Sequence, residues 1–155
     1  MISKLIVGIV TAGLLFTQAA FAGRATDGTV KIIYWQAPST LNPFLSGGTK
    51  DVESASMIIE PLARYNQDGE MLPFLAKEVP TVANGGVSSD LTSITWTLRD
   101  DILWSDGTPF TSADVKFTAD YCMHPEGGCA QMSKFGGVTS VETMGDYKVK
   151  VTFDG

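Results

Sequence analysis

The sequence contains few residues that could carry catalysis or bind nucleic acid. Among 155 residues there are one histidine and two cysteines, and neither G-x-S-x-G nor H-E-x-x-H occurs. A hydrolase normally needs a nucleophile with its base, or a metal site, and neither pattern is visible. Lysine and arginine total 11 against 17 acidic residues, and they form no basic patch. Nucleic acid and anionic membranes are therefore poor partners, and the negative charge mainly favours solubility.

The first 22 residues have the features of a secretory signal peptide. Lys4 is their only charge, an apolar run extends from Leu5 to Phe16, and Ala20-Phe21-Ala22 forms a small-x-small cleavage site. A membrane anchor is the alternative, although glycine, threonine and glutamine dilute the run. We predict a signal peptide over residues 1–22 and a mature protein outside the cytoplasm.

The rest of the chain alternates between predicted strands and helices. We expect a strand that is buried on both faces at 29–36, followed by an irregular loop and a helix over 50–62 that ends near Pro61. Further strands are predicted on both sides of the turn at 66–69, at 93–99, and in a hairpin around Gly145-Asp146. This order indicates an α/β or α+β class. The final strand stops at its turn residue, so we expect the chain to be a fragment of a longer domain.

The stretch "WTLRDDILWSDGTPFTSADV", residues 96–115, contains four aspartates. An EF-type calcium loop with Gly107 at its sixth position would have only Asp106 among its four side-chain ligands. Asp106-Gly107 is instead typical of a turn, and Thr111 with Asp114 is typical of a capping box at a helix start. We therefore interpret this stretch as structural, with no catalytic residue in it.

Cys122 and Cys129 lie seven residues apart across a Pro-Glu-Gly-Gly turn. In an exported protein, two cysteines favour a single disulfide. The alternative is a metal site in which both cysteines and His124 are ligands, with Met123 or Met132 nearby. No fourth firm ligand is visible in the sequence, so we favour the disulfide and assign no metal or cofactor.

Several dispersed motifs resemble the family 5 extracellular solute-binding proteins, the binding components of peptide and nickel ABC importers. The motifs are "STLNPF", "MIIEPLARYNQDGEMLPFLAKEV", "SITWTLRDDILWSDGTPFTSADVKFT" and "VETMGDYKVKVTF". The resemblance covers residues 30–154 and departs at Ser112, where the family pattern has alanine. It implies an α/β, periplasmic-binding-protein-like (type II) fold with two lobes. Residues 23–155 would form the N-terminal part of the solute-binding domain, with the second lobe absent.

The resemblance also implies a function. The protein would bind dipeptides or oligopeptides in the periplasm and deliver them to ABC transporter permease subunits in the membrane, without catalysis. Nickel or another small solute is the alternative ligand within the same family. A secreted hydrolase is a less favoured alternative from a different class.

By the same resemblance, the loop after the S-L-N-P motif reaches the ligand cleft. It corresponds to "LSGGT", with Gly47, Gly48 and Thr49 as candidate ligand-binding residues. Glycines permit close approach of a ligand to the backbone, and the next helix would offer free N–H groups. A plain flexible loop is the alternative. Trp35 and Phe135 are weaker candidates that fit the core equally well.

Overall fold

The computed structural model describes residues 28–155 of the chain. The predicted signal peptide lies outside these residues. Residues 34–155 form one compact unit, and residues 28–33 belong to a separate one. Within residues 28–155, no helix has the length and apolar character needed to cross a membrane.

A three-stranded antiparallel sheet is the centre of the compact unit. Its strands are β3 (Ser93–Thr97), β4 (Val138–Thr143) and β5 (Lys148–Phe153), in the order β3–β5–β4. Val151 of β5 lies between Ile94 of β3 and Val141 of β4. The hairpin predicted around Gly145 is confirmed as β4 and β5, and the positive φ of Gly145, 77°, permits its turn.

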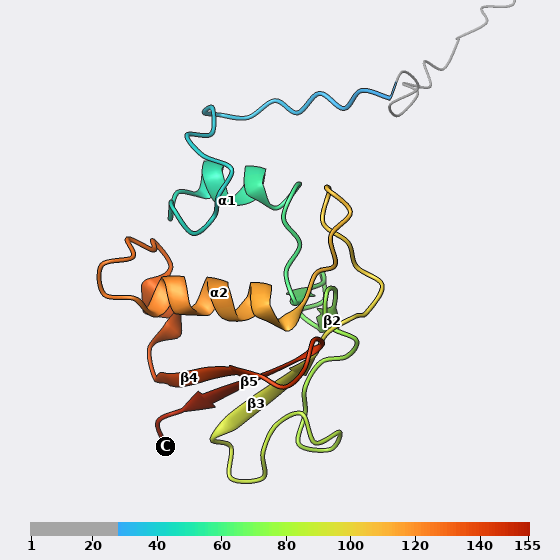
Figure 1. Cartoon of the computed structure of the whole chain (residues 1–155). Coiled ribbons are helices and arrows are strands. Elements are labelled where there is room, and N and C mark those ends of the chain that lie inside the picture. The colour runs from blue at the N-terminus through green and yellow to red at the C-terminus, as the bar shows by residue number, and fades with distance from the viewer. Residues whose placement is uncertain (1–27) are drawn as a thin grey trace, which may run out of the picture. The chain divides into compact units, whose positions relative to one another are not determined.

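Helix α2 (Ser112–Met123) runs along one face of this sheet (Figure 1). It begins at the predicted capping box, in which the Asp114 carboxylate accepts a 2.7 Å hydrogen bond from the backbone N–H of Thr111. Ser112, the departure from the family pattern, has a structural role. It is buried, its hydroxyl donates to the carbonyl oxygen of Gly145 at 2.7 Å, and its N–H donates to that of Asp146 at 2.7 Å. These bonds attach the start of α2 to the β4–β5 turn.

The core lies between α2 and the sheet. Its buried members come from the sheet, from α2 and from the loops that lead into them: Leu75, Leu98, Phe110, Ala119, Val141 and Val149. The predicted strand at 93–99 is confirmed as β3, which Leu98 follows; Leu98 is fully buried and Trp96 packs against the core. Trp96 and Leu98, two positions apart, therefore both face the core, as the pattern predicts.

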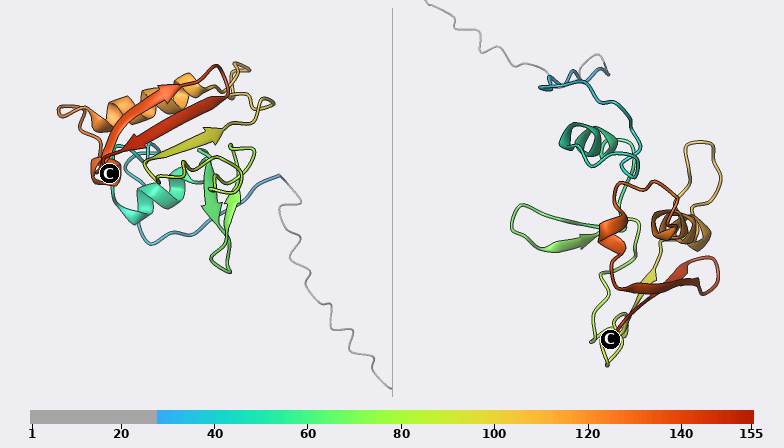
Figure 2. Two further views of the ribbon diagram at one scale, coloured as in Figure 1. Left: turned by 90° about the horizontal axis from the view of Figure 1, so that it is seen from below. Right: turned by 90° about the vertical axis from the view of Figure 1, so that its left-hand side faces the viewer.

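A second, smaller hairpin lies beside the main sheet (Figure 2). It consists of β1 (Ala63–Tyr65) and β2 (Met71–Pro73), as predicted. The Asn66 side-chain oxygen accepts hydrogen bonds from the N–H groups of Asp68 and Glu70, each at 2.9 Å. This amide closes the turn by copying backbone hydrogen bonding.

Two predicted elements are wrong. Residues 29–36 form no strand, and Ile33 and Trp35 are 98% and 72% exposed. A strand needs a neighbouring strand for its N–H and C=O groups, and neither of the two sheets in the described residues includes this segment. The helix predicted over 50–62 is shorter: α1 spans Thr49–Ala55. Beyond Ala55 the Ser56 hydroxyl donates to the Glu53 carbonyl, and the chain tightens into i+3 turns well before Pro61.

Candidate functional site

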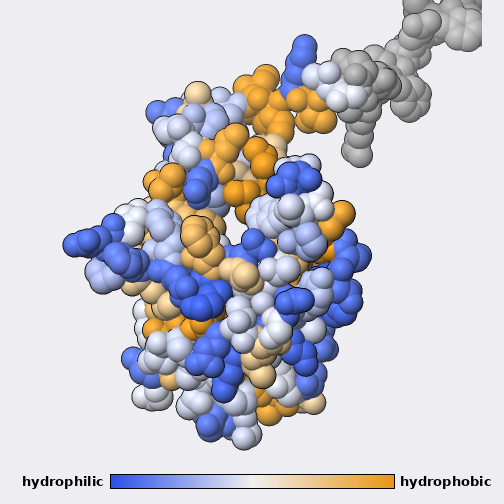
Figure 3. Space-filling model, in the orientation of Figure 1, coloured by the Kyte–Doolittle hydropathy of each residue, from blue (hydrophilic) through white to orange (hydrophobic). Residues whose placement is uncertain are grey.

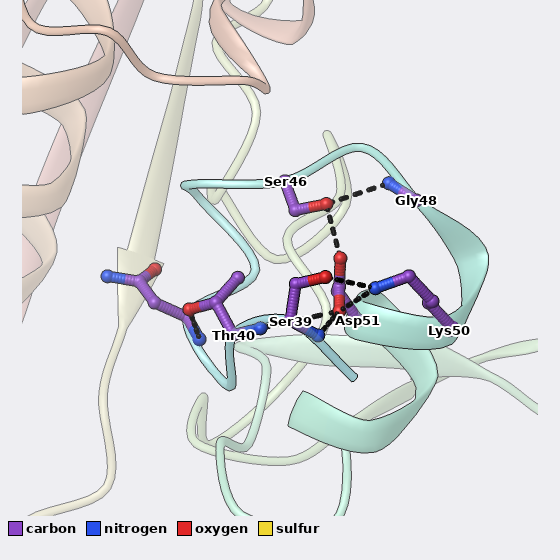
Figure 4. Close-up of polar contacts among 7 residues, drawn as sticks. Ser39, Thr40, Ser46, Gly48, Lys50 and Asp51 are labelled. Atoms are coloured by element: carbon purple, nitrogen blue, oxygen red, sulfur yellow. Dashed lines mark hydrogen bonds and ion pairs between the residues drawn. The ribbon is translucent and has the colours of Figure 1, made fainter. Parts of the chain in front are cut away.

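The candidate loop, defined here as residues 44–49, is held at one end by the side chain of Asp51 (Figure 4). Asp51 is only 2% exposed. Its carboxylate accepts hydrogen bonds from the Ser39 N–H at 2.6 Å, the Ser46 hydroxyl at 2.7 Å and the Lys50 ammonium at 2.9 Å. A buried carboxylate must be paired in this way to remain charged. Asp51 therefore joins the "STLNPF" segment to the start of α1.

The pKa of Asp51 lies well below its ordinary value of 3.8. The hydrogen bond from the Ser46 hydroxyl is the largest cause and the one from Lys50 is the next, and together they outweigh the opposing effect of burial. Lys50 also donates to the Ser39 hydroxyl at 2.5 Å. The acid is thus ionised at neutral pH and keeps its role as an acceptor.

The asparagine of "STLNPF" shapes the entry to the candidate loop. The Asn42 side-chain oxygen accepts a 2.9 Å hydrogen bond from the Phe44 N–H, and its carbonyl accepts one from the Leu45 N–H at 3.1 Å. This is the Asx-type turn that Asn-Pro sequences favour. Asn42 of this motif therefore fixes the backbone at the entry to the loop and, among the described residues, makes no hydrogen bond to its tip at Gly47.

The other side of the candidate loop is held by the segment that follows the cysteine pair. Cys122 and Cys129 form a disulfide with an S–S distance of 2.02 Å. The next residue, Ala130, donates its N–H to the Phe44 carbonyl at 2.8 Å. Gln131 donates its amide to the carbonyls of Pro43 and Ser46, each at 3.3 Å. The sequence carries no signal for these contacts, because they join positions 85 and 88 residues apart.

Gly47 and Gly48 form the open tip of the candidate loop. Among residues 28–155, neither the N–H nor the C=O of Gly47 has a hydrogen-bond partner, and a Cβ there would meet no atom within 4 Å. Gly48 has φ −74° and ψ 131°, and a Cβ would meet only Ser46 and Asp51 at ordinary contact distances. Other residues would therefore fit both positions. The local fold does not require these glycines. The backbone groups of Gly48 are paired, since its N–H donates to the Ser46 hydroxyl and its C=O accepts from Asp51 and Val52, so in the described part of the chain Gly47 alone offers unpaired groups at this tip.

The remaining candidates are Thr49, Trp35 and Phe135. Thr49 begins α1, which has only seven residues and hence a weak dipole. Trp35 is exposed, with its ring centroid 6.1 Å from that of Tyr34. Phe135 belongs to the 3-10 helix η1 (Met132–Phe135) and packs against the core. Gly47, Gly48 and Thr49 are thus consecutive residues of one loop. Phe135 lies against the core, the alternative location expected from the sequence.

A large, mostly apolar cavity of about 1210 Å³ lies beside Phe44 of the candidate loop and extends to the core residues Phe110 and Val141. It is lined by Phe44 and Phe135 together with the exposed apolar residues that follow α1, Met57, Ile58 and Ile59. In Figure 3 hydrophobic surface borders the hollow below α1. The cavity has more apolar than polar lining and continues into the packed core.

All four aspartates of the 96–115 stretch have local structural partners. Asp100 pairs with Lys77 at 3.1 Å, and Asp101 pairs with Arg99 at 2.7 Å. Asp106 accepts hydrogen bonds from the N–H and hydroxyl of Thr108, and Asp114 caps α2. These partners lower the pKa values of Asp100, Asp101 and Asp106. No group of three or more potential metal ligands occurs within residues 28–155.

Comparison with known proteins defines the class first. The structure matches that of the PBP AgaA from A. tumefaciens R10 in complex with agropinic acid, with a TM-score of 0.65 and 32% identity. The match covers 75% of this chain and 22% of AgaA. The predicted type II periplasmic-binding-protein fold is therefore confirmed for the part that this chain contains.

The family follows from the sequence. Residues 70–155 match the model of the bacterial extracellular solute-binding proteins, family 5 Middle. This chain belongs to that family. It is 28% identical over 131 residues to the oligopeptide-binding protein OppA of Bacillus subtilis, covering 76% of this chain and 23% of OppA. It is 40% identical over 70 residues to the nickel-binding periplasmic protein of Escherichia coli, covering 45% of this chain and 12% of that protein. The chain thus spans about a quarter or less of these relatives.

Proposed function

We propose that this chain is the N-terminal part of the substrate-binding component of an ABC importer, and that its ligand is a peptide. In this proposal the protein is exported by its signal peptide to the periplasm, closes around the ligand and presents it to the membrane permease. It performs no catalysis. Closure would be a shift between open and closed populations that the ligand favours through its contacts with both sides.

One observation carries the proposal: the backbone of Gly47 is exposed and unpaired within residues 28–155, while the residues around it are held firmly. A peptide that adds to a protein as a strand needs unpaired N–H and C=O groups in a fixed position. The Asp51 network and Gln131 supply that fixed position before any ligand arrives. Preorganisation of this kind reduces the entropy lost on binding.

Two other ligand classes remain as alternatives because of specific similarities. The nickel-binding relative from Escherichia coli favours a metal, and the AgaA structure with agropinic acid favours that acid or a similar small solute. The metal alternative differs from a peptide in the protein groups that must bind the ligand. A metal needs converging donor side chains, whereas an extended peptide needs backbone groups, which the candidate loop offers.

Thermal shift and calorimetric titration of the complete protein test the proposal. The probes are trialanine, a tryptic digest of serum albumin, nickel chloride and agropinic acid, each added separately. We expect the peptides to raise the melting temperature and to be recovered intact by mass spectrometry. A shift with nickel or agropinic acid alone would replace the proposed ligand. Progressive cleavage of the peptides would show that the protein is an enzyme.

A further inference from the structure

The carbonyl groups of the candidate loop depend on the segment that leaves the disulfide. Among residues 28–155, the carbonyls of Pro43, Phe44 and Ser46 accept hydrogen bonds only from Ala130 and Gln131. Gln131 supplies two of these three bonds with one amide group, so it spans the turn from Pro43 to Ser46. The loop is therefore held by Asn42 through the N–H of Phe44 and by Asp51 through the Ser46 hydroxyl. Its carbonyls are held by Ala130 and Gln131.

The disulfide fixes the start of the short segment that carries Gln131. Cys122 belongs to α2 and is fully buried, and Cys129 is also buried, two residues before Gln131. α2 is anchored in the core through Ala119. The covalent bond adds a second, direct connection between α2 and residue 129 beside the turn at 124–128. A cross-link of this kind limits the positions that the following residues can take.

We infer that Gln131 is the positioning residue of the candidate loop, and that the Cys122–Cys129 disulfide holds Gln131 in place for that role. The consequence for ligand binding rests on the proposed function, whereas the positioning of the loop by Gln131 does not depend on any ligand. Within residues 28–155, no hydrogen bond joins Gln131 to Gly47. It fixes the carbonyls before the tip, so that the tip presents its backbone in one orientation.

Hydrogen exchange of the complete, ligand-free protein tests the structural part. We expect Gln131→Ala to accelerate exchange of the hydrogen-bonded amides of the candidate loop, those of Phe44, Leu45 and Gly48, by about tenfold, the effect of losing hydrogen bonds that order a loop. Gln131→Met keeps the size of the side chain but removes its donors, and the same acceleration is expected. Gln67→Ala is the matched control, because Gln67 is an exposed glutamine in the β1–β2 turn. The melting temperature of all three variants should stay near that of the parent protein.

Unchanged exchange in Gln131→Ala would overturn the inference, and unchanged exchange in Gln131→Met alone would reduce Gln131 to a packing residue and overturn its role as donor. A variant with both cysteines changed to alanine should show the same local acceleration. If its exchange at 44–49 stays at the parent rate, the disulfide has no part in positioning.

Calorimetric titration with trialanine and with the albumin digest separates this inference from the proposed function. If both hold, Gln131→Met weakens peptide binding and Gln67→Ala does not. If exchange accelerates while peptide affinity stays unchanged, the positioning role stands and the loop is not the ligand site. The two failures are therefore distinguishable in one set of variants.

Discussion

The Asp51 carboxylate accepts a 2.7 Å hydrogen bond from the hydroxyl of Ser46, which lies five residues earlier and at the entrance to the glycine pair. The same Ser46 oxygen accepts the N–H of Gly48 at 3.1 Å. A single hydroxyl therefore connects a buried acid to the open tip of the candidate loop. This relay explains how a loop with two consecutive glycines keeps one conformation.

Replacement of Asp51 should loosen the candidate loop. Asp51→Asn keeps the shape but removes the charge that Lys50 and Ser46 recognise, and it directs an NH2 group at hydrogen-bond donors. We expect a lower melting temperature and about tenfold faster exchange of the hydrogen-bonded amides of Phe44, Leu45 and Gly48. Asp120→Asn is the control, because Asp120 also pairs with a lysine, Lys116, but on the exposed face of α2. Equal effects of the two variants would contradict the buried network.

A bulky side chain at the loop tip should block the ligand without unfolding the protein. Gly48→Trp is compatible with the φ and ψ values at this position, so stability should be retained. The Gly48 backbone groups are already paired within the chain, so the tryptophan would act as a steric block over the unpaired groups of Gly47. If the peptide pairs with Gly47, affinity should fall by at least about tenfold, which corresponds to one lost hydrogen bond to the peptide. Calorimetric titration with trialanine and the albumin digest measures the change.

Gly136→Trp is the matched control for this experiment. Gly136 has φ −58° and ψ 132°, close to the conformation of Gly48, and it is also exposed. We expect unchanged affinity in this variant. Unchanged affinity in Gly48→Trp as well would remove the loop from the ligand site.

Asp90 should contribute stability that disappears only in strong acid. The Ser88 hydroxyl and the N–H and hydroxyl of Thr92 donate to its carboxylate, and they lower its pKa from 3.8 to about 2. A lowered folded-state pKa means that the stabilisation is complete above pH 3.8 and is lost as the pH falls towards 2. The difference in unfolding free energy between the parent and Asp90→Asn should therefore be largest near neutral pH, shrink as the pH falls from 3.8 towards 2, and level off below that pH.

Urea denaturation at a series of pH values measures this difference. Asp68→Asn is the control, because the Asp68 side chain accepts no hydrogen bond within residues 28–155. A difference for Asp90→Asn that is constant across the whole pH series would contradict the assignment.

Ser112→Ala should destabilise the protein although the family pattern has alanine at this position. The substitution removes the hydroxyl that donates to the Gly145 carbonyl and weakens the link between α2 and the β4–β5 turn. We expect a loss of about 0.5–1.5 kcal/mol in the free energy of unfolding. Ser89→Ala is the control, because Ser89 is exposed in the turn before β3, and it should change stability by less than about 0.5 kcal/mol. Chemical denaturation compares the two.

Elements with short-range determinants could be predicted from the sequence. The β4–β5 hairpin, the Asn66 turn and the capping box at Thr111 each depend on residues within a few positions of one another. The strand predicted at 29–36 failed because alternation and apolar character do not supply a partner strand. The prediction that the helix extends to Leu62 was wrong. The apolar spacing continues to Leu62, but local hydrogen bonds at Ser56 end the helix at Ala55.

The sequence by itself determined the family, the order of the main elements and the position of the glycine-rich loop, because these depend on motifs and local patterns. Only the tertiary structure showed why the loop is ordered. Asp51 becomes a buried acceptor, and Gln131 reaches carbonyls more than eighty residues earlier in the chain. Such contacts depend on how α1, α2 and the disulfide are placed in space, and no spacing in a single sequence encodes that placement in a readable form.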